Sequence, residues 1–516
     1  MRLMILCLII AMVLLAGFGA AEESEIVFPV DRETVEGARR LQTLRGSGAI
    51  EMGGMTGTID LTFAVPDKIH TVVDMGLLRI EQGFNGETAW ILDQNGQVEE
   101  LTGFERTSIV NSAYLTGMSY IVDERMPGEI ISVNDTTVDS LVYKAFRVIP
   151  EGGDTLFLYI NPETGRVEIT REFIDEVSLT SFMSDFREIG GIEIPFLQIS
   201  RASIPQFNAR VEYAEIAVNI PIDYSIFNVS EEGRVDFSIP ERADSVMVGF
   251  TYHNGHIYLE ASVEGHAPVY FILDSGAGTN LVELAYAEKL GLEIEGELPA
   301  KGISGYDEVS LTRLDSIAVG DIRLFDQVAA VADFSGLGLK APGELGGLIG
   351  YDLLSRLPCR IDYAAEKIVF YRSGIFTPPD STLAIEFETF MKIPVVKAEY
   401  SGLEANLVVD FGNQVGLVFN QAFVEAHKLE GTFTDIEEMN SALGGIGGKS
   451  ETYAATGGPF RVGPVEIKKT PLMVVAGGLG LSGSTEINGN IGNSFLEQFS
   501  IILDYAGRRL YILPPE

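Results

Sequence analysis

Residues 269–282, V-Y-F-I-L-D-S-G-A-G-T-N-L-V, carry the clearest structural signal in the sequence. Five apolar residues run directly into Asp274, so the pattern predicts a buried strand that ends on a carboxylate. A second stretch, A-N-L-V-V-D-F-G-N-Q-V-G-L-V-F at residues 405–419, ends its apolar run in the same way at Asp410. Two strands that both end in Asp-x-Gly suggest two copies of one structural unit.

The surroundings of the two acids repeat in the same order. The paired landmarks are G-I-S-G-Y from 302 and G-I-G-G-K from 445, G-L-I-G ending at 350 and G-N-I-G ending at 492, and the Asp of R-I-D-Y at 362 and of I-L-D-Y at 504. Their offsets are nearly constant, with 410 − 274 = 136, 445 − 302 = 143, 492 − 350 = 142 and 504 − 362 = 142. Self-similarity at a fixed period indicates a duplicated fold unit.

The motif Asp-Ser-Gly-Ala after an apolar strand, followed further on by Leu-Ile-Gly at 348–350, resembles the aspartic peptidases. The resemblance covers roughly residues 250–516. It implies a mainly β, bilobal β-barrel fold with an internal pseudo-twofold repeat, with one lobe at 245–375 and the other at 380–516. It also implies that Asp274 and Asp410 are catalytic, that the substrate is an extended polypeptide, and that one chain, as a monomer, carries a complete site.

The same resemblance assigns supporting roles to the glycines and their neighbours. These residues are Ser275, Gly276, Ala277, Gly412 and Asn413 in the two Asp loops, Gly350 and Gly492 beneath them, and Gly302, Gly305, Tyr306, Gly445 and Gly448 in two flaps over the cleft. The implied chemistry needs no metal or cofactor. Two carboxylates about 3 Å apart share one proton, so one is a base toward water and the other an acid toward the peptide carbonyl.

The second motif departs from the family pattern at Phe411. The residue between Asp and Gly is usually Ser or Thr, whose hydroxyl clamps the two loops together, and Ser275 fits this pattern whereas Phe411 has no donor. Asn413 is the expected substitute, as an amide donor to Asp410. The departure leaves open a second hypothesis, a weak or inactive peptidase-like cleft that binds peptides or lipopeptides.

Residues 25–235 form a different region. Alternating runs separated by Asn-Gly turns predict an antiparallel β domain with one or two helices, near residues 33–43 and 105–119. The run G-F-N-G-E-T-A-W-I-L-D-Q-N-G-Q-V, residues 83–98, resembles the LolA-like lipoprotein-carrier half-barrels. That resemblance implies an apolar or lipid ligand, a spacer or a prodomain. The polar stretch 230–245 is the expected linker.

Composition and the amino terminus limit the function classes. The formal charge of −38 opposes binding to nucleic acid or to anionic membranes. Residues 1–21 have one Arg, an apolar run and small residues, which predicts a signal peptide and a secreted or periplasmic protein. The alternative is an uncleaved membrane anchor.

Two further patterns suggest cofactor or metal sites but have simpler explanations. Gly478 to Gly483 reads G-x-G-x-x-G, yet G-L-G-L also occurs at Gly336 in the other repeat, which favours a structural feature of the duplicated unit. His253, His256 and His266 lie close in sequence, but no ligand cluster with metal spacing accompanies them, so exposed hairpin positions are expected.

Overall fold

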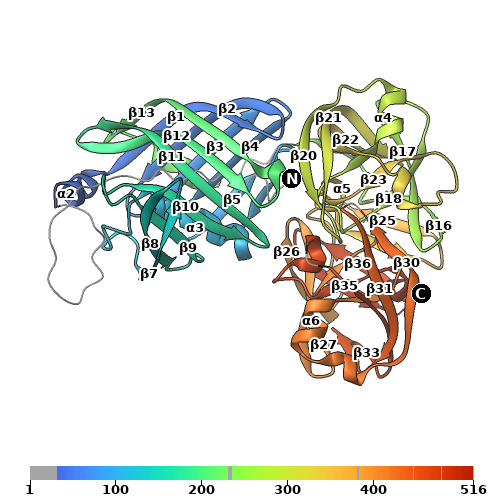
Figure 1. The fold of residues 1–516 in the computed structure, drawn as a ribbon. Helices are drawn as coiled ribbons and strands as arrows, with labels where there is room; N and C mark the ends of the chain where they lie inside the picture. The colour runs from blue at the N-terminus through green and yellow to red at the C-terminus, as the bar shows by residue number, and fades with distance from the viewer. Residues whose placement is uncertain (1–31, 230–234, 381–382, 446, 478, 515–516) are drawn as a thin grey trace. The chain divides into compact units, whose positions relative to one another are not determined.

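The computed structural model describes residues 32–229, 235–380, 383–445, 447–477 and 479–514 (Figure 1). The predicted signal peptide lies outside these residues. The chain divides into two compact units, one of residues up to 234 together with 296–299, and one of residues 235–295 and 300–516. Among the described helices, none is both long enough and apolar enough to cross a bilayer.

The first unit is a single antiparallel sheet in which chain neighbours pair in order and β1 pairs with β13. Its strands are β1 (Thr43–Met52), β2 (Met55–Ala64), β3 (Lys68–Met75), β4 (Leu78–Phe84), β5 (Ala89–Leu92), β6 (Val98–Glu100), β7 (Gly128–Val138), β8 (Leu141–Pro150), β9 (Leu156–Ile160), β10 (Val167–Ile174), β11 (Val177–Ile189), β12 (Ile192–Ala202) and β13 (Ala209–Val218). The end strands β6 and β7 have no sheet neighbour on their outer sides within the described residues, so the sheet is a half-barrel, as predicted.

Helix α3 (Gly103–Thr116) links β6 to β7 and contacts strands from both halves of the sheet, including β3, β4, β5, β8 and β10. Most of its side chains are buried, so it fills the concave side of the half-barrel (Figure 1). The shorter α2 (Arg32–Arg40) contacts β12. Both helices lie where the sequence predicts them.

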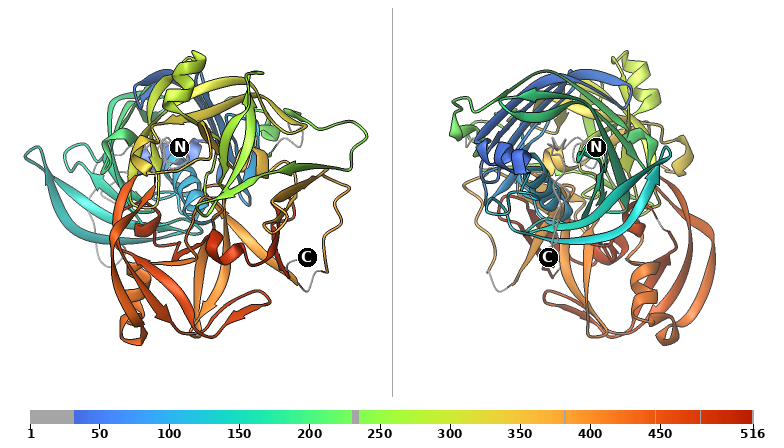
Figure 2. Two further views of the ribbon diagram at one scale, coloured as in Figure 1. Left: turned by 90° about the vertical axis from the view of Figure 1, so that its right-hand side faces the viewer. Right: turned by 60° about the vertical axis from the view of Figure 1, so that its left-hand side comes forward.

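The second unit consists of two lobes, each with its own curved sheet (Figure 2). The first lobe contains β14 (Phe237–Ser238), β15 (Ser245–Gly249), β16 (Thr251–His253), β17 (His256–Val263), β18 (Val269–Leu273), β19 (Leu281–Glu283), α4 (Leu284–Leu290), β20 (Glu295–Lys301), β21 (Tyr306–Val319), β22 (Ile322–Ala332), β23 (Leu345–Ile349), α5 (Tyr351–Leu354), β24 (Cys359–Asp362) and β25 (Lys367–Tyr371).

The second lobe repeats this order. It contains β26 (Ala384–Phe390), β27 (Ile393–Tyr400), β28 (Leu403–Val409), β29 (Leu417–Asn420), α6 (Gln421–Ala426), β30 (Thr434–Gly445), β31 (Gly448–Gly457), β32 (Phe460–Val462), β33 (Val465–Ile467), β34 (Thr470–Val475), the 3-10 helix η6 (Gly480–Gly483), β35 (Gly489–Ile491), α7 (Asn493–Leu496), β36 (Ser500–Asp504) and β37 (Arg509–Leu513). The duplicated unit predicted from the repeat and the mainly β, two-lobed fold implied by the resemblance are therefore confirmed.

The lobes are joined by a sheet that runs β15-β25-β24-β36-β37-β26. At its centre, Arg360 pairs with Ile502, and 502 − 360 = 142 is the offset found between the sequence repeats. A residue that pairs with its own repeat equivalent lies on the pseudo-twofold axis. The apolar side chains of both lobes form one continuous core around this sheet.

Part of the predicted linker belongs to the first lobe. Strand β14 pairs with β22, and the carboxylate of Asp236 accepts a 3.0 Å hydrogen bond from Nε of Arg356. These two side chains are 1% and 2% exposed, and Gln327 Nε2 also donates to Asp236, at 2.9 Å. The sequence reading missed this ion pair because Asp236 lies in a polar stretch that has the composition of a linker.

Candidate active site

The two acids occupy equivalent positions at the ends of two buried strands. Asp274 follows β18, which runs parallel to β23, and its N–H donates to the Ile349 carbonyl at 2.9 Å. Asp410 follows β28, which runs parallel to β35, and its N–H donates to Ile491 at 3.0 Å. The parallel neighbouring strand fixes the backbone at each strand end, and it therefore fixes the position of each Asp residue.

The structure brings the two carboxylates face to face. The N–H of Gly276 donates to Oδ1 of Asp274 at 2.8 Å, and the N–H of Gly412 donates to Oδ1 of Asp410 at 2.9 Å. A Cβ added to Gly276 would lie 2.8 Å from Oδ1 of Asp410, and one added to Gly412 would lie 2.4 Å from Cγ of Asp274. Each glycine is therefore required because the opposite carboxylate occupies the space of a side chain.

Burial and mutual repulsion keep a proton on this pair. Burial raises the pKa of Asp274 to about 6, against the lowering effect of the Gly276 N–H. Burial, and after it the negative charge of Asp274, raises the pKa of Asp410 well above its ordinary value. The pair titrates as a unit, and between its two ionisation steps it holds one shared proton.

Ser275 clamps the first loop to the second. Its side chain is fully buried, its hydroxyl donates to the Val409 carbonyl at 2.7 Å, and it accepts from the Phe411 N–H at 3.0 Å. These two bonds cross from one lobe to the other and flank Asp410 on both sides. This is the role that the family resemblance implies for a hydroxyl at this position.

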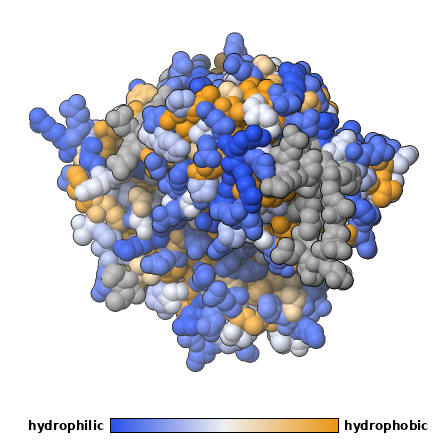
Figure 3. Space-filling model, turned by 90° about the vertical axis from the view of Figure 1, so that its left-hand side faces the viewer, coloured by the Kyte–Doolittle hydropathy of each residue, from blue (hydrophilic) through white to orange (hydrophobic). Residues whose placement is uncertain are grey.

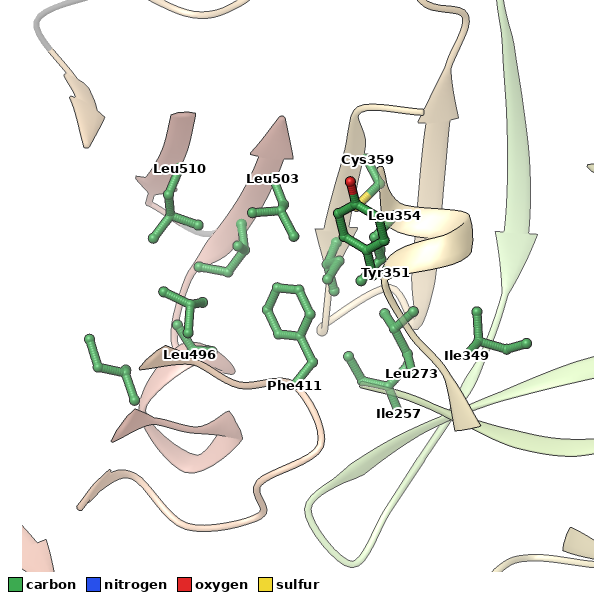
Figure 4. Packing of buried hydrophobic residues seen from close by; sticks show 14 of the residues in the cluster. Ile257, Leu273, Ile349, Tyr351, Leu354, Cys359, Phe411, Leu496, Leu503 and Leu510 are labelled. Carbon is green, nitrogen blue, oxygen red and sulfur yellow. The ribbon is translucent and has the colours of Figure 1, made fainter. Parts of the chain in front are cut away.

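Phe411 makes apolar contacts where the family has a hydroxyl. Its side chain is completely buried, and Figure 4 shows the ring among Leu273, Leu496 and Leu503 in the core between the lobes. The second loop is thus anchored by burial of a ring. At about 25 cal/mol per Å² and 150–250 Å² for an aromatic side chain, such burial stabilises by several kcal/mol.

Asn413 does not supply the side-chain donor that the sequence suggests. Its Nδ2 donates to Oδ1 of Asn490 at 2.6 Å, and its Oδ1 accepts from the Val415 N–H at 2.9 Å. The second bond is a local Asx turn, the usual competitor for a short amide side chain. It is the backbone N–H of Asn413 that acts on Asp410, where it lowers the pKa.

Gly350 and Gly492 lie beneath the loops, where only hydrogen fits. A Cβ on Gly350 would be 2.5 Å from the Ala277 carbonyl oxygen, and one on Gly492 would be 2.2 Å from that of Val415. The next residue in each case donates a backbone bond to the loop above, Tyr351 to Ala277 at 3.0 Å and Asn493 to Asn413 at 2.7 Å. Both turns support their Asp loops.

The predicted flaps are two hairpin tips that touch each other. Gly302 and Gly305 close the first, with a 2.8 Å bond from N–H to carbonyl, and Gly445 pairs with Gly448 at the base of the second. The hydroxyl of Ser450 donates to that of Ser304 at 2.7 Å. The positive φ of Gly448, 106°, is a conformation that side chains disfavour.

The first flap also binds the second lobe directly. The N–H groups of Leu481 and Ser482, in η6, donate to the carbonyls of Gly302 and Ile303 at 2.8 and 2.9 Å. The G-x-G-x-x-G run that contains η6 thus holds a flap. Tyr306 begins β21 and is half-buried, with the Lys301 ammonium 5.9 Å from its ring centroid.

One histidine differs from the expectation of exposed hairpin positions. His253 and His256 pair across the β16–β17 hairpin, but His256 is buried, because β17 is a central strand of its sheet. Burial lowers the pKa of His256. Within the described ranges, no group of three metal-ligating side chains occurs.

Comparison with known proteins supports the assignment of this segment. The aspartyl protease family model matches residues 259–353, which contain Asp274 and Gly350. A comparison with curated proteins found no match. The second unit therefore has the tandem lobes and facing Asp-x-Gly loops of an aspartic-peptidase fold, and residues 259–353 match that family directly.

Several solved structures are similar over parts of the chain. The aspartic proteinase of Irpex lacteus has 12% identity over 53% of this chain and 98% of its own, with a TM-score of 0.33. A LolA superfamily protein from Nitrosomonas europaea has 12% identity over 38% of this chain and 94% of its own, with a TM-score of 0.29. A DUF1329 family protein from Desulfovibrio piger has 10% identity over 38% of this chain and 92% of its own, with a TM-score of 0.28.

Proposed function

We propose that the second unit is an exported aspartic-type endopeptidase that hydrolyses peptide bonds in extended substrates. The observation that supports this is the pair of carboxylates, Asp274 and Asp410, each held by the glycine N–H of its own loop and each in contact with the glycine of the other. A water bound between them would lose a proton to ionised Asp274 while protonated Asp410 donates to the carbonyl oxygen. General acid–base catalysis of this kind accelerates by roughly 10²–10⁴-fold.

The flaps give this proposal its substrate geometry. A peptide that lies over the acids must pass the closed contact between Ser304 and Ser450, so binding requires the tips to separate. Once inside, an extended backbone can pair with the hairpin strands as an added strand does. The cleft then covers several residues on each side of the scissile bond, which favours endopeptidase activity.

The test is a digest of a peptide library by the wild-type protein and by Asp274→Asn and Asp410→Asn. Each variant keeps the shape of the side chain but removes an acid, so cleavage is expected to fall roughly 10²–10⁴-fold in both. Ser262→Ala is the matched control, because this half-buried residue of β17 pairs with Ala318 of β21 and belongs to neither Asp loop. Unchanged turnover in either Asn variant would disprove the proposal.

A binding function is the second candidate, and Phe411 is the observation that favours it. Here the same cleft would hold a peptide or lipopeptide without cleaving it. On the first unit, α3 occupies the concave side of the half-barrel, so an apolar ligand there would have to displace it. Saturable binding of library peptides with no cleavage between pH 4 and 9 would support this candidate over the first.

A further inference from the structure

The lobes contact each other through two equivalent hairpin tips. Gly255, at the β16–β17 tip, lies against the second Asp loop, since a Cβ there would be 2.7 Å from Cβ of Gln414. The β26–β27 tip lies against the first Asp loop, since a Cβ on Gly278 would be 2.7 Å from the Met391 carbonyl oxygen. Each lobe therefore touches the catalytic loop of the other.

The side chains that fasten these tips are different in the two lobes. Tyr351 and Asn493 occupy equivalent positions directly after the turns at Gly350 and Gly492, since 493 − 351 = 142. The Tyr351 ring lies under the buried ammonium of Lys392, with Nζ 4.7 Å from the ring centroid. At Asn493 the contact is a hydrogen-bond network instead.

Asn493 is fully buried and joins three segments. Its Nδ2 donates to the Phe411 carbonyl at 2.6 Å and to the Gly255 carbonyl at 2.8 Å, and its Oδ1 accepts from the Tyr363 hydroxyl at 2.7 Å. Phe411 belongs to the second lobe, whereas Gly255 and Tyr363 belong to the first. The N-cap of α7 is Gly492, so the Asn493 side chain does not cap this helix, and its amide bonds to other segments.

The network acts on the loop that lacks a hydroxyl. Ser275 holds the N–H of Phe411 and Asn493 holds its carbonyl, so the peptide groups on both sides of this residue are fixed to the first lobe. We infer that Asn493 is a positioning residue for Asp410, which replaces the clamp that a Ser or Thr at position 411 would provide. This role rests on the proposed peptidase function.

Asn493→Ala and Tyr363→Phe test the inference, with kcat and KM measured separately across the pH range. Small misplacements of catalytic groups cost up to about 10²-fold in rate. We expect kcat to fall on the order of 10–100-fold for Asn493→Ala and 2–5-fold for Tyr363→Phe, with KM within about threefold of wild type. Tyr511→Phe is the control, because that buried hydroxyl has no hydrogen-bond partner in the described part of the chain, and it should leave kcat unchanged.

The pH profile separates positioning from a loss of stability. If the loops move apart, the Asp274 charge acts less on Asp410, so the alkaline limb of kcat/KM should move to lower pH. An active wild type with unchanged kcat and pH profile in both variants would overturn this inference alone. If Asn493→Ala does not fold, Tyr363→Phe still decides between the outcomes. A wild-type protein that cleaves nothing overturns the proposed function, and this role with it.

Discussion

Restoring the residue typical of the family at position 411 should destabilise this protein. Phe411→Thr removes a fully buried ring, and truncation of a buried Phe costs about 3–5 kcal/mol. By the pseudo-twofold symmetry with Ser275, the new hydroxyl can donate to the Leu273 carbonyl and accept from the Ser275 N–H. Two such bonds contribute about 1 kcal/mol each. The expected net loss is about 1–3 kcal/mol in the free energy of unfolding.

The measurement must report on the second unit. Trp90 is the single tryptophan and lies in β5, so its fluorescence follows the first unit. Differential scanning calorimetry, with amide hydrogen exchange of peptides from 384–514, assigns the transition to the correct unit. A loss of this size should lower its Tm by several degrees.

A second substitution isolates the contribution of the hydroxyl. Phe419→Thr removes an equally buried ring in the same lobe, away from the partners available at position 411. It should cost more than Phe411→Thr by the value of the two hydrogen bonds, about 2 kcal/mol. A Phe411→Thr protein as stable as wild type would show that the ring does not anchor the second loop, and the argument from burial would be wrong.

Three further predictions concern the acids, the flaps and the buried ion pair. Since burial raises the pKa of Asp274 to about 6, kcat/KM should fall about tenfold per pH unit below pH 6 as the pair gains its second proton. The stability that the protonated acids contribute is complete only below their ordinary pKa of about 4, and it is lost as pH rises through their raised pKa values, which for Asp274 is about 6. Asp410→Asn should therefore raise Tm at pH 8 but not below pH 4. An acid limb of kcat/KM with its midpoint near pH 3 would contradict the raised pKa of Asp274. Cysteines at positions 304 and 450 should block cleavage when oxidised and permit it when reduced, because the flap tips must separate; equal activity in both states would exclude closure at this contact. Arg356→Met should lower the free energy of unfolding by about 3–5 kcal/mol, because it leaves the Asp236 charge buried and unpaired. The double variant with Asp236→Leu should recover most of this stability. Equal losses of stability in the single and double variants would refute the ion pair as the cause.

Local pattern accounts for much of the fold. The alternating runs that predict an antiparallel domain over 25–235 form strands such as β3 and β4, and α3 covers most of the predicted helical stretch near 105–119. The constant offset of 142 predicted a duplicated unit, and the Arg360–Ile502 pair lies on its axis. These features are readable because periodicity and repetition are properties of the sequence itself.

The two acids, the glycines beside them and the two-lobed plan could be predicted from the amino-acid sequence, since buried strand ends and repeated turns leave a local signature. The contacts that hold the acids in place became visible only in the folded protein. The Asn413 side chain donates to Asn490, and the Asn493 side chain donates to the carbonyls of Phe411 and Gly255. Asp236 forms an ion pair with Arg356. In each case the partner lies far away along the chain. The physical reason is that a short polar side chain has several partners of nearly equal strength, and packing of the distant segments selects one.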